Sequence, residues 1–126
     1  MILGIGTDII DVERVKNIYD KYGERFLDKI LTLDEKEYCL SHENPAQYIA
    51  ARFAAKEATA KCFGHGIGAK MEWKHIELRR RESGQPYIQF SEHALKTFCN
   101  LECDVHVSVS HTREYATATT IVESWE

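Results

Sequence analysis

The strongest constraint on the fold of this chain is an alanine-rich helical segment that starts at Pro45 and ends before Gly64. Proline is favoured at the first position of a helix, and glycine is favoured just past its end. Ala50, Ala54 and Ala58 recur at four-residue spacing, so one side of this helix lacks bulky side chains. Because such a smooth stripe permits close approach, we expect this helix to lie directly on a sheet.

The rest of the chain consists of short strand and helix patterns, and no repeat, low-complexity tract or linker divides it. Strands are expected over residues 1–8, around 76–78 and 88–90, over 105–109 and over 115–122. Short helices are expected after Asp11, over 24–31, after Thr32, which has capping-box spacing to Glu35, and over 91–101. Strands and helices are segregated rather than arranged as βαβ repeats. We therefore expect an α+β fold, one domain over residues 1–126 with the long helix packed on a mostly antiparallel sheet.

Composition argues against several classes of protein. Of the 126 residues, 44% are hydrophobic and 29% are charged, as in globular rather than disordered proteins. The net charge of −4 provides no overall attraction to nucleic acid, and no segment approaches the ~20 apolar residues of a membrane span. Asp8 and Asp11 interrupt the N-terminal apolar segment, so no signal peptide is expected, and the four cysteines include no CxxC pair. We expect a cytoplasmic protein with reduced thiols and without a nucleic-acid or membrane partner.

Three charged residues have the chemistry that reactions of a pyrophosphate require. Glu57 and Lys61 lie four residues apart, on the same face of the long helix, and Asp8 stands at the expected end of the first strand. Two carboxylates are enough for Mg2+ when substrate phosphates and water complete its coordination, and a lysine balances phosphate charge. Taken singly, Asp8 is more simply a turn residue and Glu57–Lys61 a solvated surface pair, and the sequence leaves these alternatives open.

Phosphate binding by this chain has to rely on cations rather than on a glycine-rich loop. Gly4-Ile5-Gly6 lacks the third glycine of a dinucleotide-binding loop, and no GK[ST] motif occurs. His111 lies in a predicted hairpin turn, where a lone histidine is more often structural than functional.

The first helix has an apolar face and a basic face. Its apolar residues at helical spacing, expected to face the core, are Val12, Val15, Tyr19 and Tyr22. If the helix continues past Gly23, Arg14, Lys21 and Arg25 lie on the opposite face. These basic residues form either an ordinary solvated face or a docking surface that steers an acidic helix of a partner.

Four sequence blocks resemble one known family. GIGTDIIDVERV (4–15) and RFAAKEATAKCFG (52–64) are similar to the two signature blocks of holo-acyl-carrier-protein synthases, the small bacterial 4'-phosphopantetheinyl transferases. ESGQPYI (82–88) and HVSVSHTREYATA (106–118) resemble the third and fourth segments of that family. The resemblance covers nearly the whole chain in order, and the pairing of the first two blocks is highly specific.

The resemblance implies roles for individual residues. Asp8 and Glu57 correspond to the Mg2+ ligands and Lys61 to the lysine at the pyrophosphate of coenzyme A, and these three form the implied catalytic set. The other implied coenzyme A contacts are Arg52 and His111 near the adenosine 3'-phosphate, Gly64 and Gly66 in the loop lining the coenzyme, and Pro86 near the adenine. The implied contacts to the carrier protein are Arg14, Lys21 and Arg25.

The resemblance also implies a homotrimer with active sites between adjacent subunits. Larger relatives have a further acid two residues after the first aspartate, where this chain has Ile10. Lys21 stands where arginine is common, His65 where threonine is more frequent and Gln85 where lysine is frequent. These departures bear on coenzyme affinity and on the choice of carrier protein.

The activity implied by the resemblance is transfer of 4'-phosphopantetheine from coenzyme A to a serine of apo-acyl carrier protein, in support of fatty acid biosynthesis. The serine hydroxyl would attack the β-phosphate and adenosine 3',5'-bisphosphate would leave; the sequence does not identify the base. Two alternatives remain open. One is another Mg2+-dependent enzyme acting on a nucleotide or pyrophosphate ester without a carrier, and the other is a non-catalytic scaffold that binds the carrier.

Overall fold

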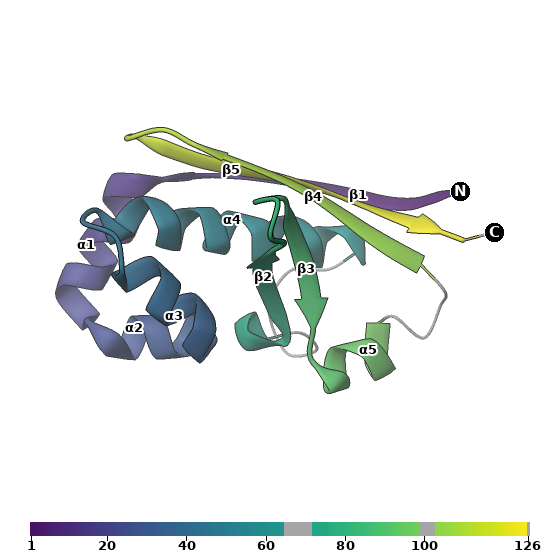
Figure 1. The fold of residues 1–126 in the computed structure, drawn as a ribbon, viewed down its shortest axis with the longest axis horizontal. Helices are drawn as coiled ribbons and strands as arrows, with labels where there is room; N and C mark the ends of the chain where they lie inside the picture. The colour runs from purple at the N-terminus through teal and green to yellow at the C-terminus, as the bar shows by residue number, and fades with distance from the viewer. Residues whose placement is uncertain (65–71, 99–102, 126) are drawn as a thin grey trace.

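The computed structural model describes residues 1–64, 72–98 and 103–125, which form two sheets and the helices around them (Figure 1). In chain order the elements are β1 (Ile2–Asp11), α1 (Val12–Tyr22), α2 (Glu24–Ile30), α3 (Leu33–Leu40), α4 (Pro45–Cys62), the 3-10 turn η1 (Trp73–His75), β2 (Ile76–Arg80), β3 (Pro86–Phe90), α5 (Glu92–Phe98), β4 (Cys103–His111) and β5 (Tyr115–Ser124).

The larger sheet has the strand order β1–β5–β4, and both of its strand pairs are antiparallel. Its register places Asp8 of β1 opposite Ala118 of β5. β2 and β3 form a second antiparallel pair, in which Arg80 lies opposite Pro86. These pairs confirm the expected α+β class with antiparallel strands, although the strands divide between two sheets.

α4 runs along one face of the larger sheet, in direct contact with β1 (Figure 1). Ala54 and Ala58 are fully buried in α4, as the alanine stripe predicts. A Cβ atom added to Gly4 would lie 2.2 Å from the carbonyl oxygen of Cys62, and one added to Gly6 would lie 2.0 Å from that of Ala58. The helix can therefore approach β1 this closely only because those two strand positions have no side chain.

The core lies where α4 meets the helical end of the molecule and the larger sheet. α1, α2 and α3 gather at one end of α4, and the β2–β3 pair lies beside its other half (Figure 1). Val15 of α1, Leu27 of α2 and Ile49 of α4 are completely buried there and belong to one hydrophobic cluster. The core thus holds α4 between the helical end and the larger sheet. The charged residues that α4 carries are Arg52, Lys56, Glu57 and Lys61.

Local capping signals explain the starts of the short helices. The side chain of Asp11 accepts a hydrogen bond from the backbone N–H of Glu13 at 2.8 Å, as expected for an N-cap. Thr32 and Glu35 form a reciprocal capping box at the start of α3. Gly23, with φ of 60°, separates α1 from α2 in a conformation that favours glycine.

Two predictions about this region are wrong. Tyr22, expected to face the core, has 52% of its surface exposed, because α1 ends at this residue and Gly23 turns the chain away. β1 continues through Asp11 rather than ending at Asp8, so Asp8 lies within a strand instead of at a strand end. The helix expected over 91–101 is described as α5 over residues 92–98, and its expected last three residues lie outside the described part of the chain.

Within the described residues, none of the helices combines the length and the apolar character that crossing a bilayer requires.

Candidate active site

β1 and α4 bring the first predicted site residues together. Lys61, in the last turn of α4, donates a hydrogen bond from Nζ to Asp8 Oδ1 at 3.2 Å and another to the carbonyl oxygen of Thr7 at 3.0 Å. The side chain of Asp8 is 18% exposed and that of Lys61 is 47% exposed. Both side chains therefore reach solvent, although their backbones belong to β1 and α4. The ion pair of Lys61 therefore joins two elements rather than two turns of one helix.

Glu57 completes the group one helical turn before Lys61. Its side chain is partly buried, and burial is the main cause that raises the pKa of its carboxyl group. The carboxylate of Asp8 raises that pKa further, and Lys61 opposes the shift. Asp8 and Glu57 thus lie close enough to repel each other, and Lys61 balances only one of these two negative charges.

This donor set fits a hard divalent cation. Two carboxylates supply oxygen ligands of the kind that Mg2+ prefers, and their mutual repulsion is relieved when a cation lies between them. In the described part of the chain, no three histidine, cysteine, aspartate or glutamate side chains come together as a complete metal site. A cation at Asp8 and Glu57 would therefore take its remaining ligands from a substrate or from water, which suits a phosphate-bearing substrate.

A second polar group consists of Arg52, which precedes Glu57 on α4, and His111 at the end of β4. Only 2% of the surface of Arg52 is exposed, yet its Nε and Nη1 atoms have no hydrogen-bond partner. The Nδ1 atom of His111 is likewise buried without a partner. Unsatisfied buried donors are rare in folded proteins and each costs about 1–3 kcal/mol, so they often mark positions where a ligand completes the hydrogen bonding.

His111 shares the electrostatic environment of Arg52. Burial lowers the pKa of His111, and the nearby cations Arg80 and Arg52 lower it further. His111 is the last residue of β4, paired with Ala116, and so does not lie in the hairpin turn as predicted. Two arginines and a neutral imidazole therefore converge on one region, which is suited to an anion.

The remaining predicted coenzyme contacts are distributed around this region. Pro86 opens β3 directly opposite Arg80, the cation that influences His111. Gly64 follows the C-terminal end of α4 with φ of 83°, a conformation that favours glycine. Gly66 lies outside the described residues, as does His65.

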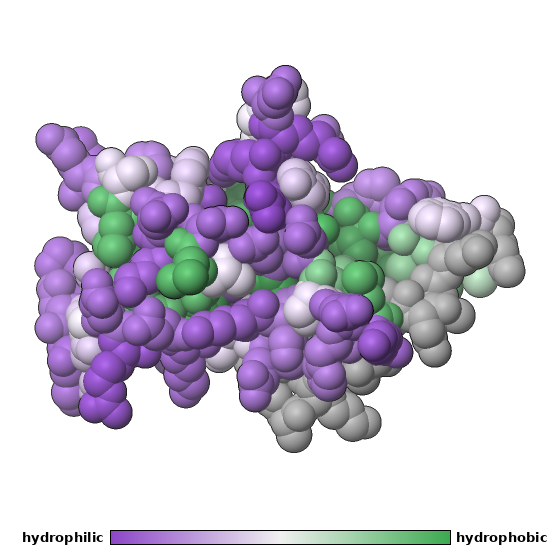
Figure 2. All heavy atoms as spheres, turned by 60° about the horizontal axis from the view of Figure 1, so that its bottom comes forward, coloured by the Kyte–Doolittle hydropathy of each residue, from purple (hydrophilic) through white to green (hydrophobic). Residues whose placement is uncertain are grey.

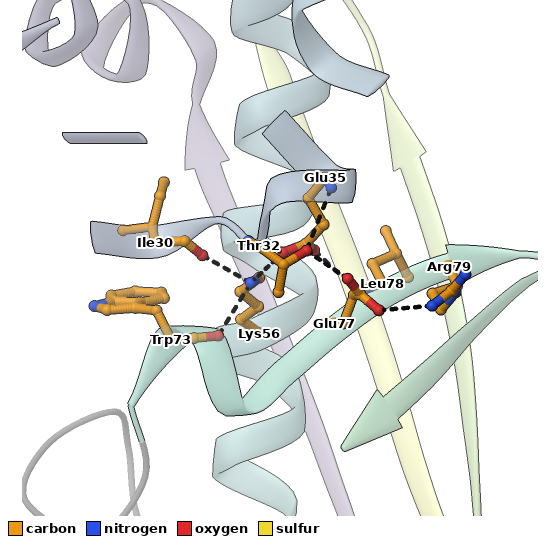
Figure 3. Close-up of polar contacts among 8 residues, drawn as sticks. All are labelled: Ile30, Thr32, Glu35, Lys56, Trp73, Glu77, Leu78 and Arg79. Carbon is orange, nitrogen blue, oxygen red and sulfur yellow. Dashed lines mark hydrogen bonds and ion pairs between the residues drawn. The ribbon is translucent and has the colours of Figure 1, made fainter. Parts of the chain in front are cut away.

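A third charged group on α4 was not predicted from the sequence. Lys56 is fully buried and donates three hydrogen bonds, to the carbonyl oxygens of Ile30 (2.7 Å) and Trp73 (3.0 Å) and to Glu35 Oε1 at 2.6 Å (Figure 3). Glu35 also accepts hydrogen bonds from the backbone N–H groups of Thr32 and Leu78. The sequence predicts only a capping role for Glu35, and the signal that could have indicated a buried charge is Lys56 within the alanine-rich segment of α4.

The network around Lys56 joins four parts of the chain to α4. Its partners come from the end of α2, the start of α3, η1 and β2 (Figure 3). Thr32 also donates a hydrogen bond from its hydroxyl to Glu77, which pairs in turn with Arg79. Burial lowers the pKa of Lys56, and the Glu35 carboxylate opposes that shift, as a paired buried cation requires.

The basic residues of α1 and α2 do not share one helix face as predicted. Arg14 and Lys21 are exposed on α1 and line one groove of about 510 Å³. Arg25 belongs to α2, because Gly23 breaks the helix, and lines a neighbouring groove of about 440 Å³. The two grooves share Ile18 and Tyr22 of α1 and are therefore adjacent on the surface.

The second groove combines apolar walls with basic residues. Its apolar lining comes from α1, α2, α4 and η1, and the groove is lined by Ile18, Tyr22, Phe26, Ile30, Phe53 and Trp73 together with Arg25 and Lys29. The face drawn in Figure 2 is mostly hydrophilic, with hydrophobic residues visible among the hydrophilic ones. The exposed Tyr22 is part of this mixed apolar and basic surface, which the helical spacing of α1 does not predict.

Comparison with known proteins identifies relatives over nearly the full length of the chain. Residues 4–120 match the family described as the 4'-phosphopantetheinyl transferase superfamily. The holo-[acyl-carrier-protein] synthase of Chlamydia trachomatis serovar L2 is 51% identical over 121 residues, which are 95% of this chain and 98% of the relative.

Solved structures agree with this relationship. A holo-[acyl-carrier-protein] synthase from Neisseria meningitidis has a TM-score of 0.90 at 32% identity, covering 98% of this chain and 100% of that one. A holo-(acyl-carrier-protein) synthase from Bacillus anthracis, crystallised in complex with CoA (3',5'-ADP), has a TM-score of 0.83 at 36% identity, covering 98% of each chain.

Proposed function

This chain belongs to the 4'-phosphopantetheinyl transferase superfamily, and we propose that it transfers the 4'-phosphopantetheine group of coenzyme A to a serine of apo-acyl carrier protein. The observation that supports this function most directly is the group formed by Asp8, Glu57 and Lys61 where β1 meets α4. It supplies two carboxylates for a cation and one ammonium for phosphate oxygens in a chain that is 51% identical to a holo-[acyl-carrier-protein] synthase.

Asp8 and Glu57 are the residues that would hold Mg2+. Bound there, the cation would neutralise charge on the pyrophosphate of coenzyme A as that charge develops. The raised pKa of Glu57 is due mainly to burial and then to the Asp8 carboxylate, and a cation held between the two carboxylates would offset their repulsion, which supports this assignment.

Lys61 is proposed to act on the leaving side of the reaction. Its ammonium group already bonds to Asp8 and to a β1 carbonyl, and its half-exposed side chain leaves room for a phosphate oxygen. The serine hydroxyl of the carrier bonds to the β-phosphorus of coenzyme A, and the bond from that phosphorus to the bridging oxygen breaks. Adenosine 3',5'-bisphosphate leaves with the bridging oxygen, and the serine proton passes to a base.

The adenosine end of the coenzyme is assigned to the second polar group. Arg52 and His111 have buried nitrogen atoms without hydrogen-bond partners and would bind the 3'-phosphate, with Arg80 nearby. Gly64, Gly66 and Pro86 would line the coenzyme. A phosphate group has several acceptor oxygens and a negative charge, so it can complete the hydrogen bonding of both side chains.

The carrier protein is assigned to the adjacent grooves of α1 and α2. Arg14 and Lys21 line one groove and Arg25 the other, so basic residues surround the apolar positions Ile18 and Tyr22. An acidic helix with an apolar side chain would match this surface, because its charges meet arginine and lysine while the apolar group enters the groove. Charge reversal at Arg14 should raise the KM for the carrier and leave that for coenzyme A unchanged.

The homotrimer with active sites between adjacent subunits, which the resemblance implies, is part of the proposal, and an uncovered apolar face of the larger sheet supports association of subunits. Leu3, Ile5 and Ile9 alternate along β1 on the face away from α4 and are 43%, 66% and 67% exposed. Ile5 lies opposite Ile121 of β5, so the apolar surface continues across strands. Such a face is costly to leave in water. Light scattering should give three times the chain mass, and Ile5→Asp should give the monomer.

A cytoplasmic location and a role in fatty acid biosynthesis complete the proposal. Of the described cysteines, Cys39, Cys62 and Cys103 are free thiols, as in proteins of a reducing compartment.

The proposed reaction is tested by the intact mass of apo-acyl carrier protein after incubation with this protein, coenzyme A and Mg2+. We expect a gain of one phosphopantetheinyl unit, and none when EDTA is present. If coenzyme A binds but no carrier gains mass, another enzyme acting on a pyrophosphate ester becomes the better description. If the carrier binds while coenzyme A neither binds nor reacts, the chain is a scaffold.

A further inference from the structure

An unbroken series of ring contacts connects Arg52 to His111. The guanidinium Cζ of Arg52 lies 4.2 Å from the ring centre of Tyr38 on α3. Tyr38 contacts His42 edge-on, with ring centres 4.8 Å apart, and His42 stacks on Tyr48 at 3.6 Å and 17°. Tyr48 contacts His111 edge-on at 5.3 Å. The two residues with unpartnered buried nitrogens thus lie at the two ends of one aromatic cluster.

Within this cluster, the rings of Tyr38, His42 and Tyr48 all contact one another. Tyr38 and Tyr48 contact each other directly, with ring centres 5.9 Å apart. His42 also pairs through Nδ1 with the carbonyl oxygen of Tyr38 at 2.8 Å, which fixes the orientation of its ring. Each such ring pair contributes about 0.5–1.5 kcal/mol, and rings have few rotatable bonds, so the cluster restricts the side chains at its ends.

Helix α3 carries Tyr38 and is fixed to α4 by the buried ion pair. Glu35 contacts Lys56 (Figure 3). One turn later on α3, Tyr38 contacts Arg52, which lies one turn earlier on α4. The two helices therefore run in opposite directions at this contact. Because Glu35 and Lys56 are 1% and 0% exposed, sliding α3 along α4 would separate a buried charge from its partner. The ion pair thus sets the position from which Tyr38 reaches Arg52.

Stacking leaves the hydrogen-bonding groups of Arg52 free. A ring lies over the face of a guanidinium group and does not use its N–H donors, unlike a carboxylate. The described residues place no acidic partner on Nε or Nη1 of Arg52. The aromatic contact therefore restrains the arginine without neutralising it, which is what a preorganised anion site requires.

We propose that Tyr38, His42 and Tyr48 are positioning residues that hold Arg52 and His111 ready for the 3'-phosphate of coenzyme A, and that they set the preference for coenzyme A over its 3'-dephospho form. This inference rests on the proposed function, which assigns the 3'-phosphate to Arg52 and His111. It adds residues that surround that subsite: Tyr38 from α3, His42 from the segment between α3 and α4, and Tyr48 from the start of α4.

The test compares coenzyme A with 3'-dephospho-coenzyme A as donors, using Tyr38→Leu and its matched control Tyr38→Phe. Tyr38→Leu should lower the ratio of kcat/KM for the two donors by roughly tenfold, mainly through a higher KM for coenzyme A. Tyr38→Phe keeps the ring and should stay within about twofold of the unaltered protein. An equal loss with both donors in Tyr38→Leu would show a merely structural role and would overturn the inference.

A second variant covers the case in which Tyr38→Leu does not fold. His42→Ala removes the stack on Tyr48 at a partly exposed position after α3 and should lower the same ratio by about threefold. An unchanged ratio in this folded variant would contradict the proposed positioning role of the aromatic cluster.

Direct binding separates failure of this inference from failure of the proposed function. Calorimetry would compare adenosine 3',5'-bisphosphate with adenosine 5'-monophosphate on the unaltered protein and on Tyr38→Leu or His42→Ala. A preference for the bisphosphate that weakens in the variants supports the inference even if no carrier is modified. Absence of that preference in the unaltered protein overturns it, whatever the transfer assay gives.

Discussion

Lys56 and Arg52 are two buried cations one turn apart on α4, and their surroundings are opposite. Lys56 has three hydrogen-bond partners for its three donors, one of them the buried carboxylate of Glu35. Arg52 is 2% exposed and has an aromatic ring against it, but its Nε and Nη1 atoms have no partner. Burial alone therefore does not distinguish a structural charge from a ligand-binding one. Completeness of hydrogen bonding does distinguish them. A cation whose donors are all paired stabilises the fold, whereas a cation with unpaired donors can still bind a ligand.

The largest expected effect is on the structural side of this comparison. Lys56→Met should destabilise the protein by about 3–5 kcal/mol, because it leaves the Glu35 carboxylate buried without its cation. Urea unfolding measures this free energy. Lys16→Met is the matched control, since Lys16 forms an ion pair with Asp20 that is more than half exposed, and its loss should leave the unfolding midpoint nearly unchanged. Equal losses in the two variants would mean that the Lys56 network contributes little to stability.

Glu57→Gln should separate stability from activity. We expect turnover to fall by about 10²–10³-fold, because one carboxylate for the cation is lost. The thermal midpoint of the metal-free protein should not fall at neutral pH, because the substitution removes a partly buried negative charge that Asp8 repels. Glu37→Gln, on the exposed surface of α3, serves as the control. Near-normal turnover in Glu57→Gln would refute the assignment of the metal ligands.

Arg52→Met should weaken coenzyme A binding and leave stability nearly unchanged, whereas Lys56→Met should mainly lower stability. The KM for coenzyme A should rise by about 10–100-fold, as expected when a charged hydrogen-bond donor to a phosphate is lost. Stability should stay within about 1 kcal/mol of the unaltered protein, because two unsatisfied donors disappear together with one ring contact. Steady-state kinetics and urea unfolding on the same preparation measure both quantities. A stability loss as large as that of Lys56→Met, with an unchanged KM, would remove the distinction between the two cations.

The smallest expected effect is the pH dependence contributed by His111. Its pKa in the folded protein is below 6.5, through burial and then Arg80 and Arg52, so the imidazole stays neutral at pH 7. The stability that it contributes is present above pH 6.5 and is lost as the pH falls through the lower folded value. Thermal midpoints from pH 7.5 to 5 should therefore decline less steeply in His111→Gln than in the unaltered protein.

Coenzyme binding should show the opposite trend at the same residue. A bound phosphate raises the pKa of His111, so the affinity for coenzyme A should rise as the pH falls. From pH 8 to 6.5 we expect a rise of less than about tenfold. This range lies above the second pKa of a phosphate monoester at ~6, so the phosphate itself stays mostly doubly charged. Calorimetry at several pH values measures this change. The same slope in His111→Gln would show that another group takes up the proton.

Much of the local structure could be predicted from the sequence. The limits of α4, the cap at Asp11, the capping box at Thr32 and the glycine break at Gly23 all depend on residues within a few positions of each other. The alanine stripe also predicted the close contact with a sheet. The resemblance named Asp8, Glu57 and Lys61, and the structure brings these three together; their roles remain predictions.

Errors arose where a local pattern met the end of an element. The helical spacing of Tyr22 predicts a buried side chain, but α1 ends there and the ring is 52% exposed beside an apolar groove. Gly23 likewise separates Arg25 from Arg14 and Lys21, so the basic face divides between two grooves. Periodicity describes which face a residue occupies within a helix, and it does not say what the end of that helix packs against.

By itself, the sequence determined which segments become helices and strands and where most of them begin and end, because hydrogen bonding, capping and side-chain spacing act over three or four residues. Only the tertiary structure decided which charges meet. Lys56 pairs with Glu35 across 21 positions and Lys61 with Asp8 across 53, and both depend on how close α4 comes to its neighbours. It also decided that Lys56 is satisfied and Arg52 is not, because the partners of a buried charge come from whichever elements the packing places around it.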